Sequence, residues 1–396
     1  MRAVMYGAGN IGRGFIGQLF ADSGYEVTFI DVDEKIVEAL NREGRYPIRF
    51  ISNEGNRDVW IKGVKAVNGN DREKTAEVIA AADIMATAVG VRVLPYIAPV
   101  IAEGIKKRFE RSSEPLNIII CENLIEADKM LAALIKEKLN TEEQRLFDER
   151  IGLVESSIGR MVPLQTSEMQ DGNLLRICSE EYGFLPVNKN AIKGKIPEMK
   201  GMTAFDTFDF FIKQKLFVHN MGHGLCAYLG MYLGDTYIYE SVKREEILFL
   251  AQNAMLESAM ALSAKYKFPI TDIYLHIRDL MRRFSNRALE DTCARVGGDT
   301  RRKLGAEDRF IGTIRFCEGE AVKPVFVSIG AAAALYQYLK ENNIQQSRKA
   351  AAKVLAEISA INEGSSISKL ILSMYSLLIE TNDSQVLQRL INAAFF

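Results

Sequence analysis

Nine consecutive residues, from Lys215 to His223, carry the side-chain types that a proton-transferring enzyme needs. They include a lysine that can act as a base, an asparagine amide and two of the three histidines of the chain. In an α-helix, at about 100° per residue from Lys215, His219 lies at roughly 40°, His223 at roughly 80° and Asn220 at roughly 140°. All four side chains can therefore face one cleft. The same pattern also fits a buried core helix whose lysine reaches the surface and whose histidines are bonded locally.

The N-terminus of the chain predicts a dinucleotide-binding turn. Residues 2–6 have the pattern of a buried strand, residues 15–20 that of a helix, and a second strand ends at Asp31. Between the first strand and the helix stands Gly7-Ala8-Gly9-Asn10-Ile11-Gly12. This is the G-x-G-x-x-G fingerprint in its strand–turn–helix–strand setting. Its glycines are expected to allow, in order, a tight turn, the approach of a pyrophosphate and close helix–strand packing, with the phosphates at the helix N-terminus.

Asp31 predicts which dinucleotide binds. It lies 31 − 12 = 19 residues after the last glycine, where an acid hydrogen-bonds the adenosine ribose and repels a 2′-phosphate. We therefore expect NAD rather than NADP, with Arg13 and Lys35 opposing this preference. The expected cofactor-binding residues, the last two at the end of a later strand, are Gly7, Ala8, Gly9, Asn10, Ile11, Gly12, Asp31, Thr87 and Val89.

Composition excludes several classes of protein. A chain of 396 residues favours two domains, and 50 Lys+Arg against 51 Asp+Glu give no overall attraction to nucleic acid or an anionic membrane. We find no apolar run near the ~20 residues that span a bilayer, and no signal peptide. Five scattered cysteines fit a reducing cytoplasm, and three histidines leave little material for a metal centre. We expect a cytoplasmic, metal-free protein that binds a small molecule, neither nucleic acid nor membrane, as a monomer or dimer.

The N-terminal half alternates strands and helices. Strands are expected at 59–61, 64–67, 84–89, 116–121 and 151–155, with a polar loop from Ser52 to Asp58 before the first of them, and helices at 75–82, 94–109 and 125–139. This alternation predicts a doubly wound, mainly parallel sheet whose ligands lie at the carboxyl ends of the strands. Asn123 then lies at the mouth of the crevice, where it either contacts a substrate or caps the following helix.

The second half is expected to be mainly α-helical. The Gly/Pro/Lys segment from Gly194 to Met202 favours a boundary, so we place an NAD-binding domain at 1–190 and a substrate domain at 191–396. Apolar residues at three- and four-residue spacing predict helices at 248–266, 270–284, 329–339, 348–361, 367–379 and 384–394. The fold class is therefore α/β, a Rossmann-type N-terminal domain followed by a helical domain that carries the 215–223 segment.

Positive charge concentrates around a turn in the second half, at Arg295, Arg301, Arg302, Lys303 and the following Arg309. Such runs are usually solvated surface. The alternative is an anion site, because the planar fork of arginine suits phosphate or carboxylate.

Motifs over nearly the whole chain resemble the polyol-specific long-chain dehydrogenases. They are Gly7-Ala8-Gly9-Asn10-Ile11-Gly12-Arg13-Gly14-Phe15-Ile16-Gly17, Thr87-Ala88-Val89-Gly90, Cys121-Glu122-Asn123, Lys215-Leu216-Phe217 with Asn220 and Gly222-His223, and Arg283-Phe284 with Asp291, Arg295-Val296, Arg302-Lys303-Leu304 and Asp308-Arg309. The K-x4-N-x2-H pattern is the most specific, and the compact length resembles the sugar-phosphate branch of the family. The resemblance implies NAD-linked, zinc-independent interconversion of mannitol 1-phosphate and fructose 6-phosphate. The alternative is a related reductase of a free ketose or a hexuronate.

The resemblance also implies roles for individual residues. Lys215 would be the general base and acid, Asn220 and Asn123 amide donors to the reacting oxygen, and His223 a support for Lys215 and the substrate. These residue types suit the chemistry, because a proton must leave the hydroxyl as hydride leaves carbon, and amides can stabilise the oxygen that gains charge. A lysine, with a reference pKa of ~10.4, serves as a base only where its surroundings lower that value. His219 falls on a variable position of the motif and is expected to be structural.

Two departures from the family pattern concern the substrate. Gly159 stands where an Asp commonly precedes the Arg of the V-D-R-I-x-P stretch, and Gly298 stands where an Arg commonly follows Arg-Val-Gly. Both positions are expected to border the substrate, so these departures concern the identity of the substrate rather than the type of reaction. The candidate phosphate-binding cations are Arg295, Arg301, Arg302, Lys303 and Lys189.

Overall fold

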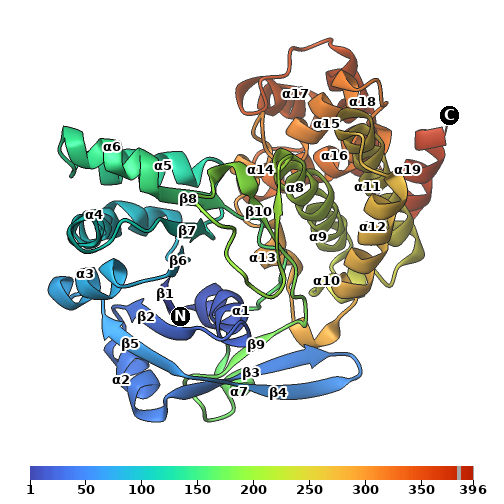
Figure 1. The fold of residues 1–396 in the computed structure, drawn as a ribbon. Coiled ribbons are helices and arrows are strands. Elements are labelled where there is room, and N and C mark those ends of the chain that lie inside the picture. Colours follow the sequence, from blue (N-terminus) through green and yellow to red (C-terminus); the bar gives the residue numbers. More distant parts are fainter. Residues whose placement is uncertain (381–384, 396) are drawn as a thin grey trace. The chain divides into compact units, whose positions relative to one another are not determined.

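The computed structural model of the protein describes residues 1–380 and 385–395 and divides into two compact units, Met1–Phe208 and Asp209–Phe396 (Figure 1). The boundary expected after residue 190 differs from this division. Strand β10 (Leu185–Asn188) pairs in parallel with β11 (Met202–Phe205), so the segment that links them stays within the first unit. The glycine- and lysine-rich segment around Gly194 is therefore a connection inside that unit.

A six-stranded parallel sheet forms the core of the first unit, in the order β5-β2-β1-β6-β7-β8. Its strands are β1 (Arg2–Tyr6), β2 (Glu26–Asp31), β5 (Val64–Asn68), β6 (Ile84–Thr87), β7 (Leu116–Ile120) and β8 (Ile151–Glu155). The predicted doubly wound sheet is confirmed. Its order reverses between β1 and β6, where Tyr6 and Thr87 pair at the carboxyl ends. Ligands of such sheets bind at this switch point.

Helices cover both faces of the sheet. Ala3 and Met5 of β1 lie in one apolar cluster with α1 and α2, whereas Val4 and Tyr6 lie in another with α3 to α6. This follows from the alternation of side chains along a strand. The helices are α1 (Gly17–Asp22), α2 (Glu34–Glu43), α3 (Arg72–Ala80), α4 (Leu94–Arg111), preceded by η2 (Val91–Val93), α5 (Ala127–Lys136) and α6 (Thr141–Arg150).

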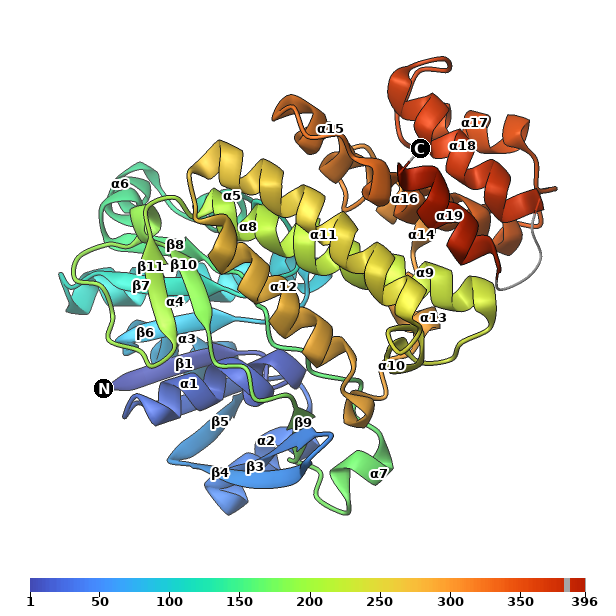
Figure 2. The same ribbon diagram turned by 90° about the vertical axis from the view of Figure 1, so that its right-hand side faces the viewer.

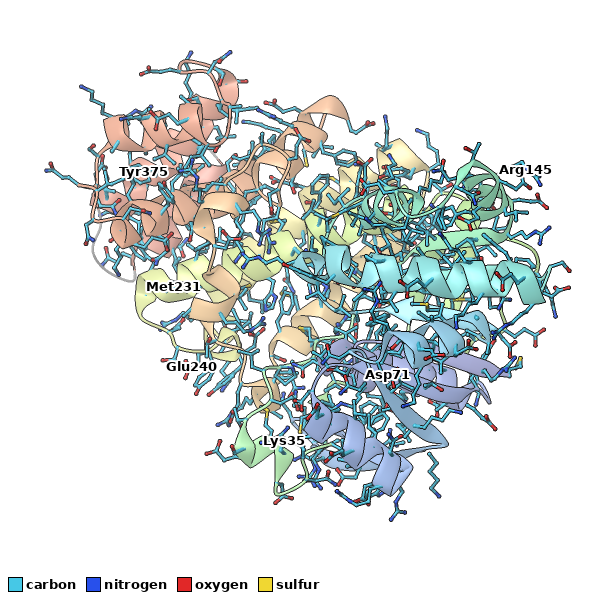
Figure 3. All side chains as sticks on the ribbon, turned by 90° about the vertical axis from the view of Figure 1, so that its left-hand side faces the viewer. Lys35, Asp71, Arg145, Met231, Glu240 and Tyr375 are labelled. Atoms are coloured by element: carbon cyan, nitrogen blue, oxygen red, sulfur yellow. The ribbon has the colours of Figure 1, made fainter. Side chains whose placement is uncertain are left out.

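Local sequence starts two of these helices. Asp33 accepts hydrogen bonds from the N–H groups of Lys35 and Ile36 at the start of α2. Asp71 accepts one from the N–H of Lys74 at the start of α3, and Figure 3 labels Lys35 and Asp71 on these elements. Both aspartates are therefore N-caps, a use that satisfies helix donors left without a partner in the first turn.

A smaller sheet, in the order β4-β3-β9, completes the first unit. Its strands are β3 (Arg45–Ser52), β4 (Gly55–Lys62) and β9 (Ile177–Ser179), and the remaining short elements are α7 (Ser167–Gln170) and η3 (Lys189–Ala191). The polar segment after Ser52, expected as a loop, belongs to a hairpin in which Ser52 pairs with Gly55. Strand pairing with β3 outweighs the polar composition of this segment.

The second unit is built from helices. They are α8 (Asp209–Lys213), η4 (Gln214–Asn220), α9 (Met221–Leu233), α10 (Ile238–Ser241), α11 (Glu245–Tyr266), α12 (Ile270–Phe284), η5 (Arg287–Leu289), α13 (Cys293–Gly297), α14 (Thr300–Lys303), α15 (Ile311–Gly319), α16 (Val325–Glu341), α17 (Arg348–Glu357), α18 (Ser366–Glu380) and α19 (Gln385–Phe395). Helix α11 packs against α9, α12 and α16, and Figure 2 shows α11 and α12 side by side. The mainly helical second half is confirmed.

The expected helices correspond to α11, α12, α16, α17, α18 and α19. Ser384, where the last of them was expected to begin, lies outside the described residues. Helix α11 is long and apolar enough to meet a length and composition test for a membrane span, with a mean hydropathy of 1.3 in its best window. Of that window 56% is buried inside the protein, and core helices meet the same test.

Candidate active site

The glycine turn after β1 has the steric properties that a dinucleotide site requires. Gly7 has a φ of +100°, and a Cβ there would lie 2.5 Å from Ala88 O. A Cβ at Gly12 would lie 1.9 Å from Gly7 O. At Gly9, by contrast, a Cβ would have no heavy atom of the described residues within 4 Å. The backbone at Gly9 is open to a ligand, so this turn fits a pyrophosphate.

Asp31 lies at the carboxyl end of β2 and contacts the same turn. Its Oδ2 accepts a hydrogen bond from Ala8 N at 2.6 Å, and its Oδ1 accepts one from Asp33 N at 3.0 Å. The carboxylate that is expected to face the ribose therefore also orders the glycine turn. The neighbouring Asn10 donates through Nδ2 to Pro163 O at 3.2 Å.

Arg13 and Lys35, the two cations expected to favour NADP, differ in their surroundings. Arg13 is 5% exposed and donates through Nε to Ala8 O at 2.5 Å and through Nη1 to Leu175 O at 2.7 Å. Lys35 is exposed at the start of α2. Because the guanidinium of Arg13 is committed to backbone carbonyls, only Lys35 keeps the solvent access that a 2′-phosphate contact needs.

The loop after β6 is the third segment, after the glycine turn and Asp31, that is expected to contact the cofactor. Thr87 is fully buried, and its Oγ1 has no hydrogen-bond partner among the described residues. Val89 N and Gly90 N donate to the two carboxylate oxygens of Glu122, at 3.0 and 2.8 Å. Glu122 therefore holds the loop that contains Val89. Sequence reasoning did not assign this role, and the only available signal was its place directly after a strand.

Asn123 lies on the exposed loop between β7 and α5. Helix α5 begins at Ala127 with Glu126 in the N-cap position, so Asn123 does not cap this helix. The N–H of Glu126 donates to Glu155 Oε1 at 3.2 Å, and burial, followed by the charge of Asp128, raises the pKa of Glu155 to about 7. The structure excludes capping of α5 by Asn123, and its contact with a substrate stays a prediction.

In the second unit, the 215–223 segment is not one regular α-helix, so that expectation was wrong. It starts in the π-helical turn η4, which contains Lys215 and Asn220, and enters α9 before His223. The i→i+5 pattern of a π-turn changes the angles between side chains, so the α-helical angles do not apply. Ser258 Oγ on α11 donates to Phe217 O of this turn at 2.8 Å, a contact that local sequence does not predict. Single π-turns are frequent at functional sites.

The other two histidines of the chain, His223 and His276, contribute to the lowered pKa of His219. His219 is 7% exposed, and burial, then the charge of Arg283 and the other histidines, holds its pKa well below the usual value. Burial and Arg283 also lower the pKa of His276, to about 4. The ring of His223 stacks on Phe284 at a centroid distance of 4.4 Å. The histidines near Lys215 are therefore neutral at neutral pH.

His223 faces a buried carboxylate. Its Nε2 lies 3.1 Å from Asp291 Oδ2, an ion-pair distance without well-aligned hydrogen-bond geometry. Asp291 Oδ1 accepts from Arg295 Nε at 2.7 Å. Burial lowers the pKa of His223 although Asp291 acts in the opposite direction. Asp291 thus connects the basic turn to the helical segment that carries Lys215.

Each candidate phosphate-binding cation has a partner within its own unit. In the second unit, Arg295 forms an ion pair with Asp291, and Arg302 forms ion pairs with Asp299 and Asp308. Arg301 donates to the Tyr338 hydroxyl at 3.3 Å. In the first unit, Lys189 forms an ion pair with Asp206. Lys303 is 5% exposed and donates to the carbonyls of Val296 and Gly298, and burial lowers its pKa to about 8. Lys303 therefore has a structural role in this turn.

The two glycines that depart from the family pattern occupy different surroundings. A Cβ at Gly159 would lie 2.8 Å from Tyr182 Cε1, so a larger residue requires this ring to move. A Cβ at Gly298 would lie 3.4 Å from the nearest backbone oxygens. Packing against Tyr182 explains glycine at the first position, and nothing in the structure explains it at the second.

A search of the described residues finds no group of three His, Cys, Asp or Glu side chains arranged to hold a metal ion. The metal-free mechanism stays a prediction.

Sequence models of both halves of one family match the chain. The mannitol dehydrogenase Rossmann domain matches residues 1–201, and the mannitol dehydrogenase C-terminal domain matches residues 207–391. A protein of Brevibacillus brevis named mannitol-1-phosphate 5-dehydrogenase is 36% identical over 85% of this chain and 86% of its own length. A protein of the same name from Geobacillus stearothermophilus is 36% identical over 79% of this chain and 81% of its own length.

Two solved structures share the fold over nearly the whole chain. A D-sorbitol dehydrogenase in substrate-free form superposes with a TM-score of 0.79 at 13% identity, covering 99% of this chain and 95% of its own. The Pseudomonas fluorescens mannitol 2-dehydrogenase, solved with NAD and D-mannitol, gives 0.74 at 13% identity, covering 99% and 94%. At this level of identity, the likeness concerns the fold.

Proposed function

The chain belongs to the mannitol dehydrogenase family, and we propose that it interconverts mannitol 1-phosphate and fructose 6-phosphate with NAD as the hydride carrier. The observation that carries the proposal is the glycine turn, in which Gly9 is open while Gly7 and Gly12 are closely packed. Two relatives at 36% identity bear the name of the sugar-phosphate enzyme, which supports a phosphorylated substrate over a free polyol or a hexuronate.

The proposed reaction needs a base and donors for the reacting oxygen. As the alcohol is oxidised, hydride leaves carbon, the hydroxyl proton leaves oxygen and a carbonyl forms. When bound, the nicotinamide supplies the hydride acceptor. We assign the proton to Nζ of Lys215, which returns it in the reverse direction. The side-chain amides of Asn220 and Asn123 are proposed to donate hydrogen bonds to the oxygen that gains charge.

His223 is proposed to orient Lys215 and the substrate rather than to carry the proton. Its lowered pKa keeps it uncharged, and its ring is held between Phe284 and the Asp291 carboxylate. The pKa of His219 is lowered well below its usual value, and the residue occupies a variable position of the motif. His219 is therefore proposed to be structural.

The preference for NAD rests on Asp31. Its carboxylate already accepts the Ala8 N–H, and this bond supports its placement beside an adenosine ribose at the glycine turn. The phosphate of the substrate is proposed to bind cations drawn from Arg295, Arg301, Arg302 and Lys189. Lys303 suits this role least, because its ammonium is committed to two carbonyls. Cytoplasmic location and a monomeric or dimeric state stay predictions.

A substrate panel tests the proposal. Oxidation of NADH and of NADPH is followed with fructose 6-phosphate, fructose and tagaturonate at equal concentrations. We expect the highest kcat/KM with fructose 6-phosphate and NADH. A preference for fructose or tagaturonate would replace the substrate assignment by one of the sibling reductases, and NADH binding without turnover on the panel would indicate a nucleotide-sensing protein.

A further inference from the structure

We propose that Tyr46, Arg160 and Arg13 are positioning residues for the dinucleotide, because they hold the first turn of the fingerprint helix in a π-helical register. This inference rests on the proposed use of NAD. It assigns a task to side chains outside the G-x-G-x-x-G fingerprint and to the glycines that follow it.

The helix after the glycine turn does not begin as an α-helix. Residues Gly12–Ile16 form a π-helical turn, η1, in which Gly17 N donates to Gly12 O, five residues earlier. Such turns are rare and frequently mark functional sites. Widening the turn breaks the regular i→i+4 ladder, and buried carbonyls that lose their ladder donor need donors from elsewhere.

Two buried side chains outside the helix donate to carbonyls of this turn. The Tyr46 hydroxyl donates to Arg13 O at 2.8 Å, and Arg160 Nη1 donates to Gly14 O at 2.7 Å. Tyr46 is fully buried on β3, and Arg160, which follows β8, is 5% exposed. The Arg13 side chain extends the arrangement towards the nucleotide turn, since its Nε donates to Ala8 O. The π-turn thus receives hydrogen bonds from Tyr46 of β3 and from Arg160 after β8.

Arg160 is directed mainly at this helix. Besides Gly14 O, its guanidinium bonds Gln18 Oε1 at 2.7 Å and lies 4.5 Å above the Phe15 ring, both on the same helix, while Nε donates to Tyr182 O. Burial lowers the pKa of Arg160 to about 10, which reflects the cost of holding this charge on neutral acceptors. A buried cation with this set of partners is well suited to fixing the position of the turn.

Two further glycines allow close packing around this turn, one against β9 and one against Tyr46. A Cβ at Gly14 would lie 2.6 Å from Ile177 Cγ2 of β9. A Cβ at Gly17 would lie 2.9 Å from the Tyr46 hydroxyl oxygen and 2.6 Å from Phe29 Cζ. The extended pattern G-x-G-x-x-G-x-G-x-x-G therefore serves two tasks. The first three glycines shape the nucleotide turn, Gly14 allows β9 to pack closely, and Gly17 leaves room for the Tyr46 hydroxyl that bonds the π-turn.

The register of this turn affects ligand binding because the N–H groups at the helix N-terminus face a bound pyrophosphate. Conversion to an α-turn removes about one residue from the turn and rotates the glycine segment relative to the rest of the helix. Losing the Tyr46 or Arg160 bond is therefore expected to weaken dinucleotide binding. It is not expected to change proton transfer by Lys215, which lies on a different unit.

Tyr46→Phe in the full-length protein tests the inference, with Tyr25→Phe as the matched control. Tyr25 is also buried, and its ring packs on Phe20 at the other end of the same helix. The NADH dissociation constant is measured by fluorescence titration, together with KM for NADH, kcat and the melting temperature. Tyr46→Phe is expected to raise the dissociation constant and KM for NADH about threefold to tenfold, from the loss of one buried hydrogen bond, with kcat at saturating NADH within about twofold.

The control and a second variant give the remaining outcomes. Tyr25→Phe is expected to leave the NADH dissociation constant unchanged, and Arg160→Lys, which loses the planar fork, is expected to weaken NADH binding at least as much as Tyr46→Phe. If both Tyr46→Phe and Arg160→Lys bind NADH with wild-type affinity, the inference is wrong, because these hydrogen bonds would then be purely structural. The proposed function would be unaffected by that result. If the unaltered protein does not bind NADH, the proposed function fails and the inference fails with it.

Discussion

Alanine substitutions at Gly9 and Gly12 are predicted to separate ligand binding from folding. The two residues stand three positions apart in one turn, yet the space around them differs. A Cβ at Gly12 would lie 1.9 Å from Gly7 O, whereas a Cβ at Gly9 would have no described heavy atom within 4 Å. Gly9 is also not among the glycines with positive φ, so alanine is compatible with its backbone.

The magnitudes follow from these two environments. In Gly12→Ala the backbone must shift, an overpacking cost of about 1–3 kcal/mol, which corresponds to a fall in melting temperature of roughly 2–12 °C. In Gly9→Ala the free protein gains about 0.4–1 kcal/mol, because alanine restricts the unfolded chain. The added methyl group then obstructs only the bound pyrophosphate. The same overpacking cost, applied to the complex alone, weakens NADH binding about 5- to 150-fold.

Thermal denaturation and NADH fluorescence titration of both variants measure these effects. We expect Gly9→Ala to melt at or slightly above the temperature of the unaltered protein and to bind NADH poorly. Gly12→Ala should show a clear loss of stability. Wild-type NADH affinity in Gly9→Ala would refute the placement of the pyrophosphate at this turn. A destabilised Gly9→Ala would refute the claim that the space is open in the free protein.

Three further predictions concern the second unit. Lys215→Ala is expected to lower kcat about 100- to 10,000-fold with NADH binding retained, the usual contribution of a positioned base, and near-normal turnover would exclude Lys215 from this role. Asp291→Asn is expected to lower kcat/KM about tenfold to a hundredfold without changing NADH affinity, because His223 and Arg295 lose a charged buried partner; an unchanged kcat/KM would contradict this. Burial raises the pKa of Glu257 from 4.5 to about 7, so its contribution to stability is present below pH 4.5 and is lost as pH rises to about 7. The free energy of unfolding, measured by urea denaturation, should therefore fall by about 3 kcal/mol relative to Glu257→Gln over this range, and parallel pH profiles would show that the carboxyl is not perturbed.

The cofactor half of the site was largely predictable because its signals are local. The tight turn at Gly7, the packing at Gly12 and the acid at the end of β2 follow from backbone sterics and from spacing along the chain. The doubly wound parallel sheet and the mainly helical second half were expected for the same reason, since side-chain periodicity reports on strands and helices. The start of β4, residues 55–58, was expected as a loop because it is polar, and pairing with β3, not composition, makes it part of a strand.

Residues that act through contacts distant in sequence were not predictable. Glu122 bonds the Val89 and Gly90 N–H groups more than thirty residues before it, and in the sequence only its place directly after a strand hints at a role. Arg160 lies 146 residues from the Gly14 carbonyl that it bonds. Likewise, the run of charge around Lys303 left a solvated surface and an anion site open as alternatives, whereas Lys303 is buried and its ammonium donates to two carbonyls.

The sequence by itself thus locates the dinucleotide turn and the lysine–asparagine–histidine segment along the chain. It can do so because glycine sterics, helix caps and apolar periodicity act over a few residues. It does not specify the register of the two helical turns that carry them. Both η1 and η4 are π-helical, and each has a backbone carbonyl bonded by a side chain from another element, Tyr46 and Arg160 in one case and Ser258 in the other. Buried carbonyls that a widened turn leaves without a donor in the helix need other partners, and which side chains reach them depends on how distant segments pack.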